Sequence, residues 1–202
     1  MPVEMQAIFD QVLAAARSRG VTDVEVIITT ADHALTRFAN NQIHQNVAER
    51  TSHLSVRPVI DGHTARASTN RLDRDGTDDV VEEAIAITRL MEPDPELLPL
   101  AEKADYEFPE RFFTATSMVT PEERGRAVAE AIRVVEQKGQ TAAGIYSTGD
   151  ASFAIFNSRG VAVSHTETMA QFSITAMGGD SSGWAKESAC SHDDLDPVLL
   201  AE

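Results

Sequence analysis

The order of predicted elements repeats once along this 202-residue chain, and the repeat constrains its fold more than any other feature. In each half, an amphipathic helix precedes several strand-like segments, a glycine-containing hairpin turn and the start of another helix. Residues that lie 118 positions apart in the two halves are similar in kind. The matched pairs are Phe38 with Phe156, Ile43 with Val161, Glu49 with Glu167, Leu54 with Phe172, Ser55 with Ser173, Val56 with Ile174, and Asp78 with Asp196. A duplicated unit explains this register, and convergence on one helix-sheet-helix pattern is the alternative.

Three long helices are predicted from apolar spacing and from their end signals. The first carries apolar residues at three- and four-residue spacing over residues 5–16, and Gly20 follows as a C-terminal cap. The second covers residues 78–89. The third follows Thr120-Pro121-Glu122-Glu123, which combines an N-cap, a first-turn proline and a capping-box glutamate.

Between the helices, alternating and β-branched residues predict strands joined by tight turns at Asp61-Gly62 and Gly178-Gly179-Asp180. The predicted strands are 24–30, 35–39, 42–49, 52–60, 63–69, 142–148, 152–156, 161–168, 170–177 and 182–189. We therefore expect an α+β fold of two related helix-sheet-helix units with mostly antiparallel strands.

The predicted domains are residues 1–92, a proline-containing connector at 93–119, and a second domain at 120–202. Aromatic residues in the connector suggest that it is anchored to a neighbouring surface. The last helix starts at Asp196-Pro197 and is much shorter than its counterpart in the first half. From this difference we expect the chain to be the front part of a longer protein.

Charge and composition exclude several classes of function. The 32 acidic and 17 basic residues give a net charge of -15, which opposes binding to nucleic acid. No apolar stretch is long enough to span a membrane, and the first residues do not resemble a secretory signal. Cys190 is the only cysteine, so no internal disulfide can form. These features predict a cytoplasmic protein.

No complete catalytic or metal-binding set of residues is present in the sequence. None of the six histidines has a second ligand at helical spacing, and ordinary polar positions explain them better than a metal site. Cys190 and His192 lack an orienting partner in any known motif. The glycine-rich segment 178–183 lacks the lysine and the helix of a phosphate loop. Trp184 is interpreted as a core residue, with an exposed partner contact as the alternative.

Residues 37–46 are the strongest candidate for a binding segment, because carboxamides are dense there for a strand region. They are Asn40, Asn41, Gln42, Gln45 and Asn46. Such side chains can hold an extended peptide beside a sheet edge. Asn40, Gln42 and His44 are the predicted substrate or partner contacts. The equally weighted alternative is that Asn40-Asn41 only shapes a hairpin turn.

The run Arg37-Phe38-Ala39-Asn40-Asn41-Gln42-Ile43-His44-Gln45-Asn46 resembles the N-terminal domain of the TldD/PmbA family. The similarity continues through Val56, Asp61-Gly62 and Ala67-Ser68-Thr69-Asn70. Three further segments resemble the middle region of the same family. They are Tyr146-Ser147-Thr148, Phe156-Asn157-Ser158-Arg159-Gly160 and residues 185–191.

The resemblance implies one subunit of a paired assembly, a homodimer or a heterodimer, that threads an unfolded peptide to a zinc site and cleaves it. In that family a later His-Glu-x-x-x-His helix and a cysteine hold the zinc in one type of subunit. This sequence contains no His-Glu pair, so no catalytic residue and no zinc ligand can be assigned. Zinc is expected in the C-terminal domain of a full-length subunit.

Three functions are compatible with these observations. We expect the N-terminal part of a metallopeptidase subunit, which contributes peptide-guiding and dimerisation surface to proteolysis. The alternative is a non-catalytic binding or regulatory module that pairs with a full-length family member. An independent hydrolase is a third interpretation, and it would require zinc-dependent cleavage by this chain alone.

Overall fold

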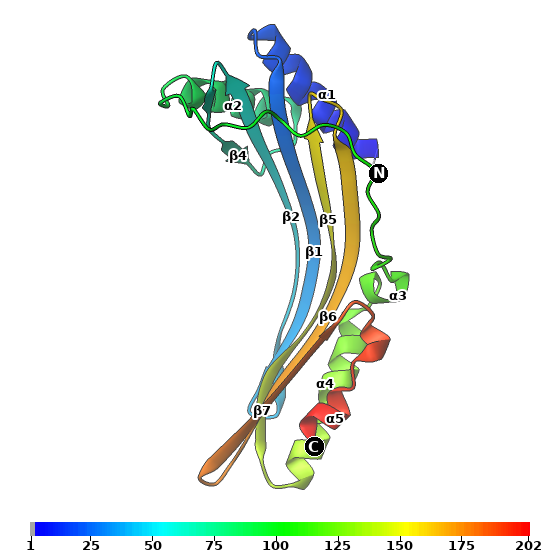
Figure 1. The fold of residues 1–202 in the computed structure, drawn as a ribbon. Coiled ribbons are helices and arrows are strands. Elements are labelled where there is room, and N and C mark those ends of the chain that lie inside the picture. Colours follow the sequence, from blue (N-terminus) through cyan, green and yellow to red (C-terminus); the bar gives the residue numbers. More distant parts are fainter. Residues whose placement is uncertain (1–2) are drawn as a thin grey trace. The chain divides into compact units, whose positions relative to one another are not determined.

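The computed structural model describes residues 3–202, which form a mixed structure of helices and mostly antiparallel strands (Figure 1). The expected α+β class is confirmed. The residues divide into two compact units, and neither is continuous in sequence. Unit 1 consists of Met1–Thr30, Thr51–Pro109 and Ser152–His165. Unit 2 consists of Ala31–Arg50, Glu110–Ala151 and Thr166–Glu202.

The element order repeats in the way the sequence predicts: a helix, two long strands, short pairing strands and a helix. The first series is α1 (Val3–Ser18), β1 (Asp23–Ala39), β2 (Gln42–Ile60), β3 (His63–Thr64), β4 (Ala67–Thr69) and α2 (Arg74–Thr88). After α3 (Thr114–Ser117), the second series is α4 (Pro121–Gln137), β5 (Thr141–Asn157), β6 (Ala162–Gly178), β7 (Ser181–Ala189), a short 3-10 turn and α5 (Pro197–Ala201). The predicted domain boundaries at residues 92 and 119 stay a prediction.

The strands form one sheet with the order β3-β2-β1-β5-β6-β7, and β4 also pairs with β2. β3 pairs with Val59 and Ile60 of β2, and β4 pairs with Leu54–Val56. β7 pairs with β6 along its whole length, from Gly178 opposite Ser181 to Ala170 opposite Ala189. All three of these pairings are antiparallel, as expected for hairpin connections.

The four long strands differ from the sequence prediction, which divided each of them into two. β1 continues through residues 31–35, where no side chain is fully buried. Without buried apolar residues the alternating pattern stops, although the backbone remains extended. The segment around Gly149 and Asp150 likewise resembles a turn in sequence and lies within β5. Hydrophobic periodicity therefore located the buried parts of these strands and missed their continuity.

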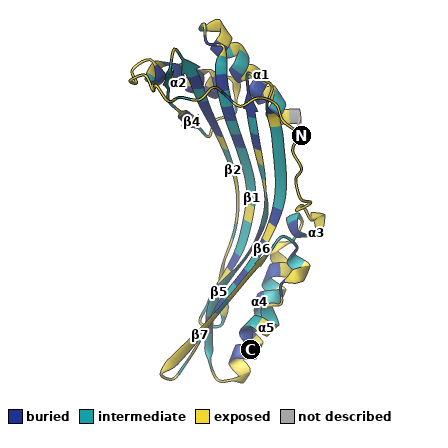
Figure 2. Ribbon diagram, viewed as in Figure 1, coloured by how far each residue is buried: buried dark blue, intermediate teal, exposed yellow. Residues whose placement is uncertain are grey.

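The core of unit 1 forms where α1 and α2 pack on the sheet (Figure 2). α1 ends as predicted, because Gly20 adopts a φ of 78°. Phe9 of α1 stacks on Phe156 of β5, with ring centroids 5.0 Å apart. Arg19 makes a bidentate ion pair with Asp78 of α2, with N–O distances of 2.9 and 2.7 Å. α1 and α2 are thereby joined by apolar packing and by this ion pair.

α2 begins earlier than the sequence predicts. Its first residue is Arg74 rather than Asp78, and the carboxylate of Asp73 accepts a hydrogen bond from the Gly76 amide at 2.7 Å. This makes Asp73 the N-cap. Residues 73–79 contain four aspartates, and the sequence interpretation chose Asp78 instead of Asp73 as the start of the helix.

The core of unit 2 forms where α4 and α5 pack on β1, β5 and β6. The predicted capping box of α4 is confirmed, since Thr120 and Glu123 satisfy each other's backbone amides. Phe172 of β6 lies at the centre of the aromatic packing. Its ring stacks on Phe38 at 6.0 Å and meets Tyr146 edge to face at 5.9 Å. Asp196 caps α5 as predicted, accepting from the amides of the second and third helical residues.

The connector between α2 and α3 is irregular but anchored at several points by hydrogen bonds. The prediction that its aromatic rings provide the anchor is wrong for most of their surface, because Tyr106, Phe108, Phe112 and Phe113 are all exposed. The Asn157 side chain donates to the carbonyl oxygen of Ala101 at 2.8 Å in unit 1. In unit 2 the Thr168 amide donates to the Arg111 carbonyl at 3.0 Å, and the Phe113 amide donates to the Thr168 hydroxyl at 3.1 Å. The segment thus has defined contacts with both β5 and β6.

Within residues 3–202, no helix combines the length and the apolar character needed to cross a bilayer.

Gly144 of β5 is predicted to be essential for packing in unit 2. A Cβ atom at this position would overlap the carbonyl oxygen of Ser173 and the ring of Phe38. We expect Gly144→Ala to lower the free energy of unfolding by about 1–3 kcal/mol, a typical cost of overpacking. Urea unfolding would measure the change. Gly183→Ala is the matched control, because a Cβ on this β7 glycine meets no atom within 4 Å. Equal stability of the two variants would contradict the prediction.

Candidate functional site

The hairpin between β1 and β2 contains all three predicted contact residues. Asn40 and Asn41 form its two-residue turn with φ values of 51° and 59°, which asparagine tolerates better than most residues. The turn interpretation is thus correct for their backbone. Gln42 and His44 follow on β2 and are exposed. Contact of Asn40, Gln42 and His44 with a substrate stays a prediction.

The polar side chains of this hairpin divide into two groups by their hydrogen bonds. Asn41 accepts from the Ala142 amide at 2.6 Å and donates to the Gln140 carbonyl at 3.2 Å, so it fixes the start of β5. Asn46 accepts from the Thr36 hydroxyl at 2.6 Å, and Gln45 accepts from Arg37 at 3.3 Å. These three side chains support the sheet.

The predicted contact residues form the second group. In the part of the chain that the structure describes, the side chains of Asn40, Gln42 and His44 have no hydrogen bond and no ion pair with the protein. Their donors and acceptors face solvent and remain available to another molecule.

The first half of β2 is an open sheet edge. Among residues 3–202, β1 lies on one side of β2, and on the other side only Leu54–Ile60 have strand partners. Residues 42–51 are exposed except for the half-buried Val47. The outer backbone groups of 42–50, which belong to unit 2, therefore have no strand partner in the described chain. Such an edge can accept an added strand.

A polar hollow of about 300 Å³ lies beside the same segment of β2 in unit 2. Ala34 and Ala48 provide small side chains in its lining, and charged groups surround them. The remaining lining residues are Asp32, His33, Glu49, Arg50, Ser117, Val119, Thr148, Gly149 and Asp150. The sequence analysis missed this hollow, because its residues come from three strands and the segment before α4.

Two aspartates in the hollow have different electrostatic environments. Asp32 accepts two hydrogen bonds from the Arg50 guanidinium, at 3.1 and 2.9 Å. Burial raises the pKa of Asp150, and the negative charge of Asp32 raises it further, while Arg50 opposes the shift. The hollow therefore favours a neutral or positively charged group near Asp150.

Arg124 supports the wall of this hollow from inside unit 2. It is 1% exposed, and its Nη1 donates to the Val119 carbonyl at 2.9 Å and to the Thr148 hydroxyl at 3.1 Å. Burial lowers the pKa of Arg124, against the opposing effect of Tyr146. Its Nε has no hydrogen-bond partner among the described residues. The side chain thus links the start of α4 to β5.

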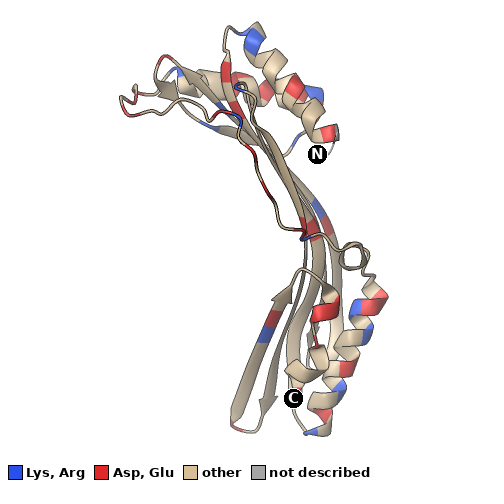
Figure 3. Ribbon diagram, turned by 45° about the vertical axis from the view of Figure 1, so that its right-hand side comes forward, with Lys and Arg blue, Asp and Glu red and all other residues tan. Residues whose placement is uncertain are grey.

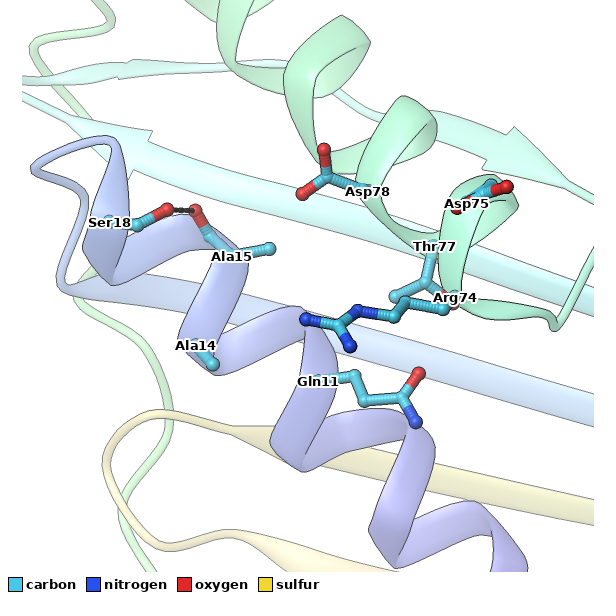
Figure 4. Close-up of a pocket in the computed structure, with 8 residues that line it drawn as sticks. All are labelled: Gln11, Ala14, Ala15, Ser18, Arg74, Asp75, Thr77 and Asp78. Carbon is cyan, nitrogen blue, oxygen red and sulfur yellow. Dashed lines mark hydrogen bonds between the residues drawn. The ribbon is translucent and has the colours of Figure 1, made fainter.

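A second hollow, of about 530 Å³, lies between α1 and the first turn of α2 in unit 1 (Figure 4). On α1 it is lined by Gln11, Ala14, Ala15 and Ser18, and on α2 by Arg74, Asp75, Thr77 and Asp78. Figure 4 shows Arg74 and Thr77 directed from α2 toward α1. Arg74 shares the lining with the carboxylates of Asp75 and Asp78. Among the described lining residues, no nucleophile is paired with a base. The hollow is a groove between two helices.

The histidines and the cysteine occupy separate environments. His63 Nδ1 lies 2.7 Å from the Met91 carbonyl oxygen, the His165 ring stacks on Phe108, and His192 contacts Thr116. Cys190 is half-buried. Residues 3–202 contain no group of three or more histidine, cysteine, aspartate and glutamate residues arranged to hold a metal ion. The described residues do not fit a zinc site, and no catalytic step is assigned to zinc in this chain.

Trp184 corrects the sequence interpretation, which placed it in the core. Its residue surface is 68% exposed on β7, and it pairs with Thr175 of β6. β7 is an edge strand, and the residues of β7 are mostly exposed. Within residues 3–202 this side of β7 is exposed, so an aromatic residue in a strand pattern is not a core residue here.

Comparison with known proteins identifies the class to which this fold corresponds. Residues 24–88 match the family model described as PmbA/TldA metallopeptidase domain 1. No curated protein matches the sequence. Among solved structures, TldE from Thermococcus kodakarensis superposes with a TM-score of 0.84 at 14% identity, covering 96% of this chain and 45% of that chain.

Two proposed modulators of DNA gyrase have the same fold. The protein from Thermotoga maritima has a TM-score of 0.85 at 18% identity, with coverage of 98% of this chain and 46% of that chain. The protein from Bacteroides thetaiotaomicron has a TM-score of 0.82 at 17% identity, with coverage of 98% and 48%. This chain thus spans less than half the length of each structure. The family model over residues 24–88 confirms the predicted relation to the TldD/PmbA family, and the solved structures show that the fold is shared.

The two turn asparagines are predicted to differ in their effect on stability. Asn41→Gly keeps the positive φ but removes the hydrogen bonds to Gln140 and Ala142, so we expect a loss of about 1–3 kcal/mol in the free energy of unfolding. Asn40→Gly removes no side-chain hydrogen bond and should change stability by less than about 0.5 kcal/mol. Chemical denaturation of both variants tests this, and an equal loss would argue against the assigned role of Asn41.

Asp150 is predicted to reduce stability at neutral pH. Because its pKa is raised in the folded state, the folded protein binds the proton more tightly than the unfolded chain does. Its contribution to stability is therefore greatest at acidic pH and is lost as pH rises through the folded-state pKa. We expect Asp150→Asn to raise the free energy of unfolding at pH 7, and this gain should shrink as the pH falls toward the ordinary aspartate pKa.

Urea unfolding between pH 3.5 and 7 measures this dependence. Asp180→Asn, in the exposed β6–β7 turn, is the control for removal of one negative charge. A stabilisation by Asp150→Asn that is the same at every pH, or that matches the control, would refute the assignment.

Proposed function

We propose that this chain forms the N-terminal part of a TldD/PmbA-type metallopeptidase subunit and contributes peptide-guiding and dimerisation surface to proteolysis. The observation that carries the proposal is the open edge of β2 at residues 42–50, beside the unbonded side chains of Asn40, Gln42 and His44. Zinc chemistry belongs to the C-terminal domain of a full-length subunit in this proposal.

An unfolded peptide would bind the β2 edge as an additional strand. Its backbone N–H and C=O groups would pair with those of residues 42–50, which supplies affinity without a requirement for a particular sequence. A folded substrate offers few extended segments with unpaired backbone groups to such an edge. The carboxamides and the imidazole would add contacts at the turn end of the strand. This arrangement suits a protein that receives unfolded polypeptides.

A partner subunit of the TldD/PmbA type is the proposed binding partner, either as a homodimer or as a heterodimer. The exposed face of β6 and β7 supports this part of the proposal. Trp184 is 68% exposed and Met177 is 39% exposed, and the β6–β7 register directs them to the same face. Tryptophan and methionine are enriched in protein interfaces.

A second candidate function is a non-catalytic binding or regulatory module that pairs with a full-length family member. Co-purification with a metal-bearing relative separates the two functions. In the leading proposal this chain raises the rate of peptide cleavage by its partner, and in the alternative the two bind while the rate is unchanged.

Strand addition at β2 predicts a specific requirement for peptide backbone amides. We expect the chain to bind a fluorescent, unstructured decapeptide and to lose about tenfold or more in affinity when alternate residues are N-methylated in one register. Methylation in the other register should have a smaller effect, because those amides point away from β2. Fluorescence anisotropy measures both. Equal binding of the unmodified and both methylated peptides would exclude strand addition.

A further inference from the structure

The connector of unit 1 presents two aromatic rings that are about half exposed. Residues 101–109 are irregular and exposed throughout. Tyr106 is 47% exposed and Phe108 is 50% exposed. Apolar rings of this size usually contact other residues in a folded protein. Their exposure on a segment that has defined contacts therefore marks a surface for an external partner.

These rings are held in position by stacking. Tyr106 stacks on Phe108 with ring centroids 6.3 Å apart, and Phe108 stacks on His165 of β6 at 5.4 Å. The preceding residue Ala101 is anchored through its carbonyl oxygen to Asn157. The row of rings is thus pre-organised on the sheet, which reduces the entropy cost of binding.

Carboxylates flank the rings. In the unit 1 part of the connector, residues 92–109 contain six acidic residues and one basic residue. The acidic residues are Glu92, Asp94, Glu96, Glu102, Asp105 and Glu107, and the basic one is Lys103. Figure 3 shows acidic positions along this segment. Among the ion pairs of residues 3–202, none involves Asp105 or Glu107.

We propose that the acidic aromatic strap, defined as Glu102, Asp105, Tyr106, Glu107 and Phe108, binds lysine- and arginine-rich segments of unfolded peptides. Cationic side chains bind favourably over the faces of aromatic rings, and nearby carboxylates add attraction and speed association. This inference rests on the proposed function, to which it adds a preference among peptide substrates.

Charge complementarity favours a basic peptide over the other molecules that could bind the strap. A second copy of this chain would bring two acidic straps together, and each copy has a net charge of -15. An acidic polymer such as nucleic acid is repelled for the same reason. An uncharged apolar segment could cover the rings, but it would remove the unpaired carboxylates from water without a counter-charge. A cationic peptide can place its positive side chains over the rings and beside the carboxylates.

The test compares two unstructured dodecapeptides of equal length, one with four lysine and arginine residues and one with glutamine at those positions. Fluorescence anisotropy with the complete chain should show about tenfold tighter binding of the cationic peptide at low salt. The preference should fall at 300 mM NaCl, where screening is strong. Circular dichroism verifies the fold of every variant.

Matched variants locate the preference on the strap. Tyr106→Leu with Phe108→Leu keeps apolar surface but removes the ring faces, and Asp105→Asn with Glu107→Gln removes two charges. Each double variant should lower the ratio of the affinities for the cationic and the glutamine peptide to about threefold or less, because a moderate interaction is lost. Phe153→Leu, which alters another exposed ring, and Glu130→Gln with Glu136→Gln on α4 are controls that should retain it.

The outcomes separate this inference from the proposed function. Equal affinity for both peptides overturns the inference, while binding of the glutamine peptide still supports strand addition at β2. A cationic preference that survives in both strap variants also overturns it, because the whole acidic surface is then responsible. Self-association that is lost in the strap variants would assign the surface to a second copy instead. Binding of neither peptide contradicts both proposals.

Discussion

Continuity of the long strands is the constraint on which the rest of the structure depends. β1 supplies Val24, Val26 and Ile28 to the core of unit 1 and Phe38 to the core of unit 2. β5 supplies Phe156 to the first core and residues 142 and 146 to the second. A one-residue slip in either strand would reverse which side chains face the helices. The two cores therefore fix the register of the same strands.

The sequence was most informative where a signal is local. The caps at Thr120 and Asp196 and the glycine after α1 set helix ends through contacts within a few residues, and the structure confirms them. Strand continuity and exposure depend on neighbours distant in sequence. The division of β1 near residue 33 was wrong for this reason, as was the buried position predicted for Trp184.

The candidate site shows the same limit. The density of carboxamides correctly drew attention to residues 37–46, but sequence could not separate supporting side chains from free ones. Asn41 binds backbone groups of residues 140 and 142, about a hundred positions away, whereas its neighbour Asn40 has no such bond. The hollow around Asp150 was missed, because an isolated aspartate within a strand carries no motif, and its raised pKa arises from residues on other strands.

The two proposed binding surfaces have different selectivities. An open strand edge binds any extended backbone, so its selectivity has to come from side-chain contacts elsewhere. Aromatic rings beside unpaired carboxylates can supply this selectivity. They bind a basic side chain more tightly than a neutral one, whatever the conformation of the peptide backbone. A chain that has both can accept many unfolded peptides and still rank them by charge. The peptide-guiding role proposed here requires this combination, and it places no demand on a nucleophile or a metal within these residues.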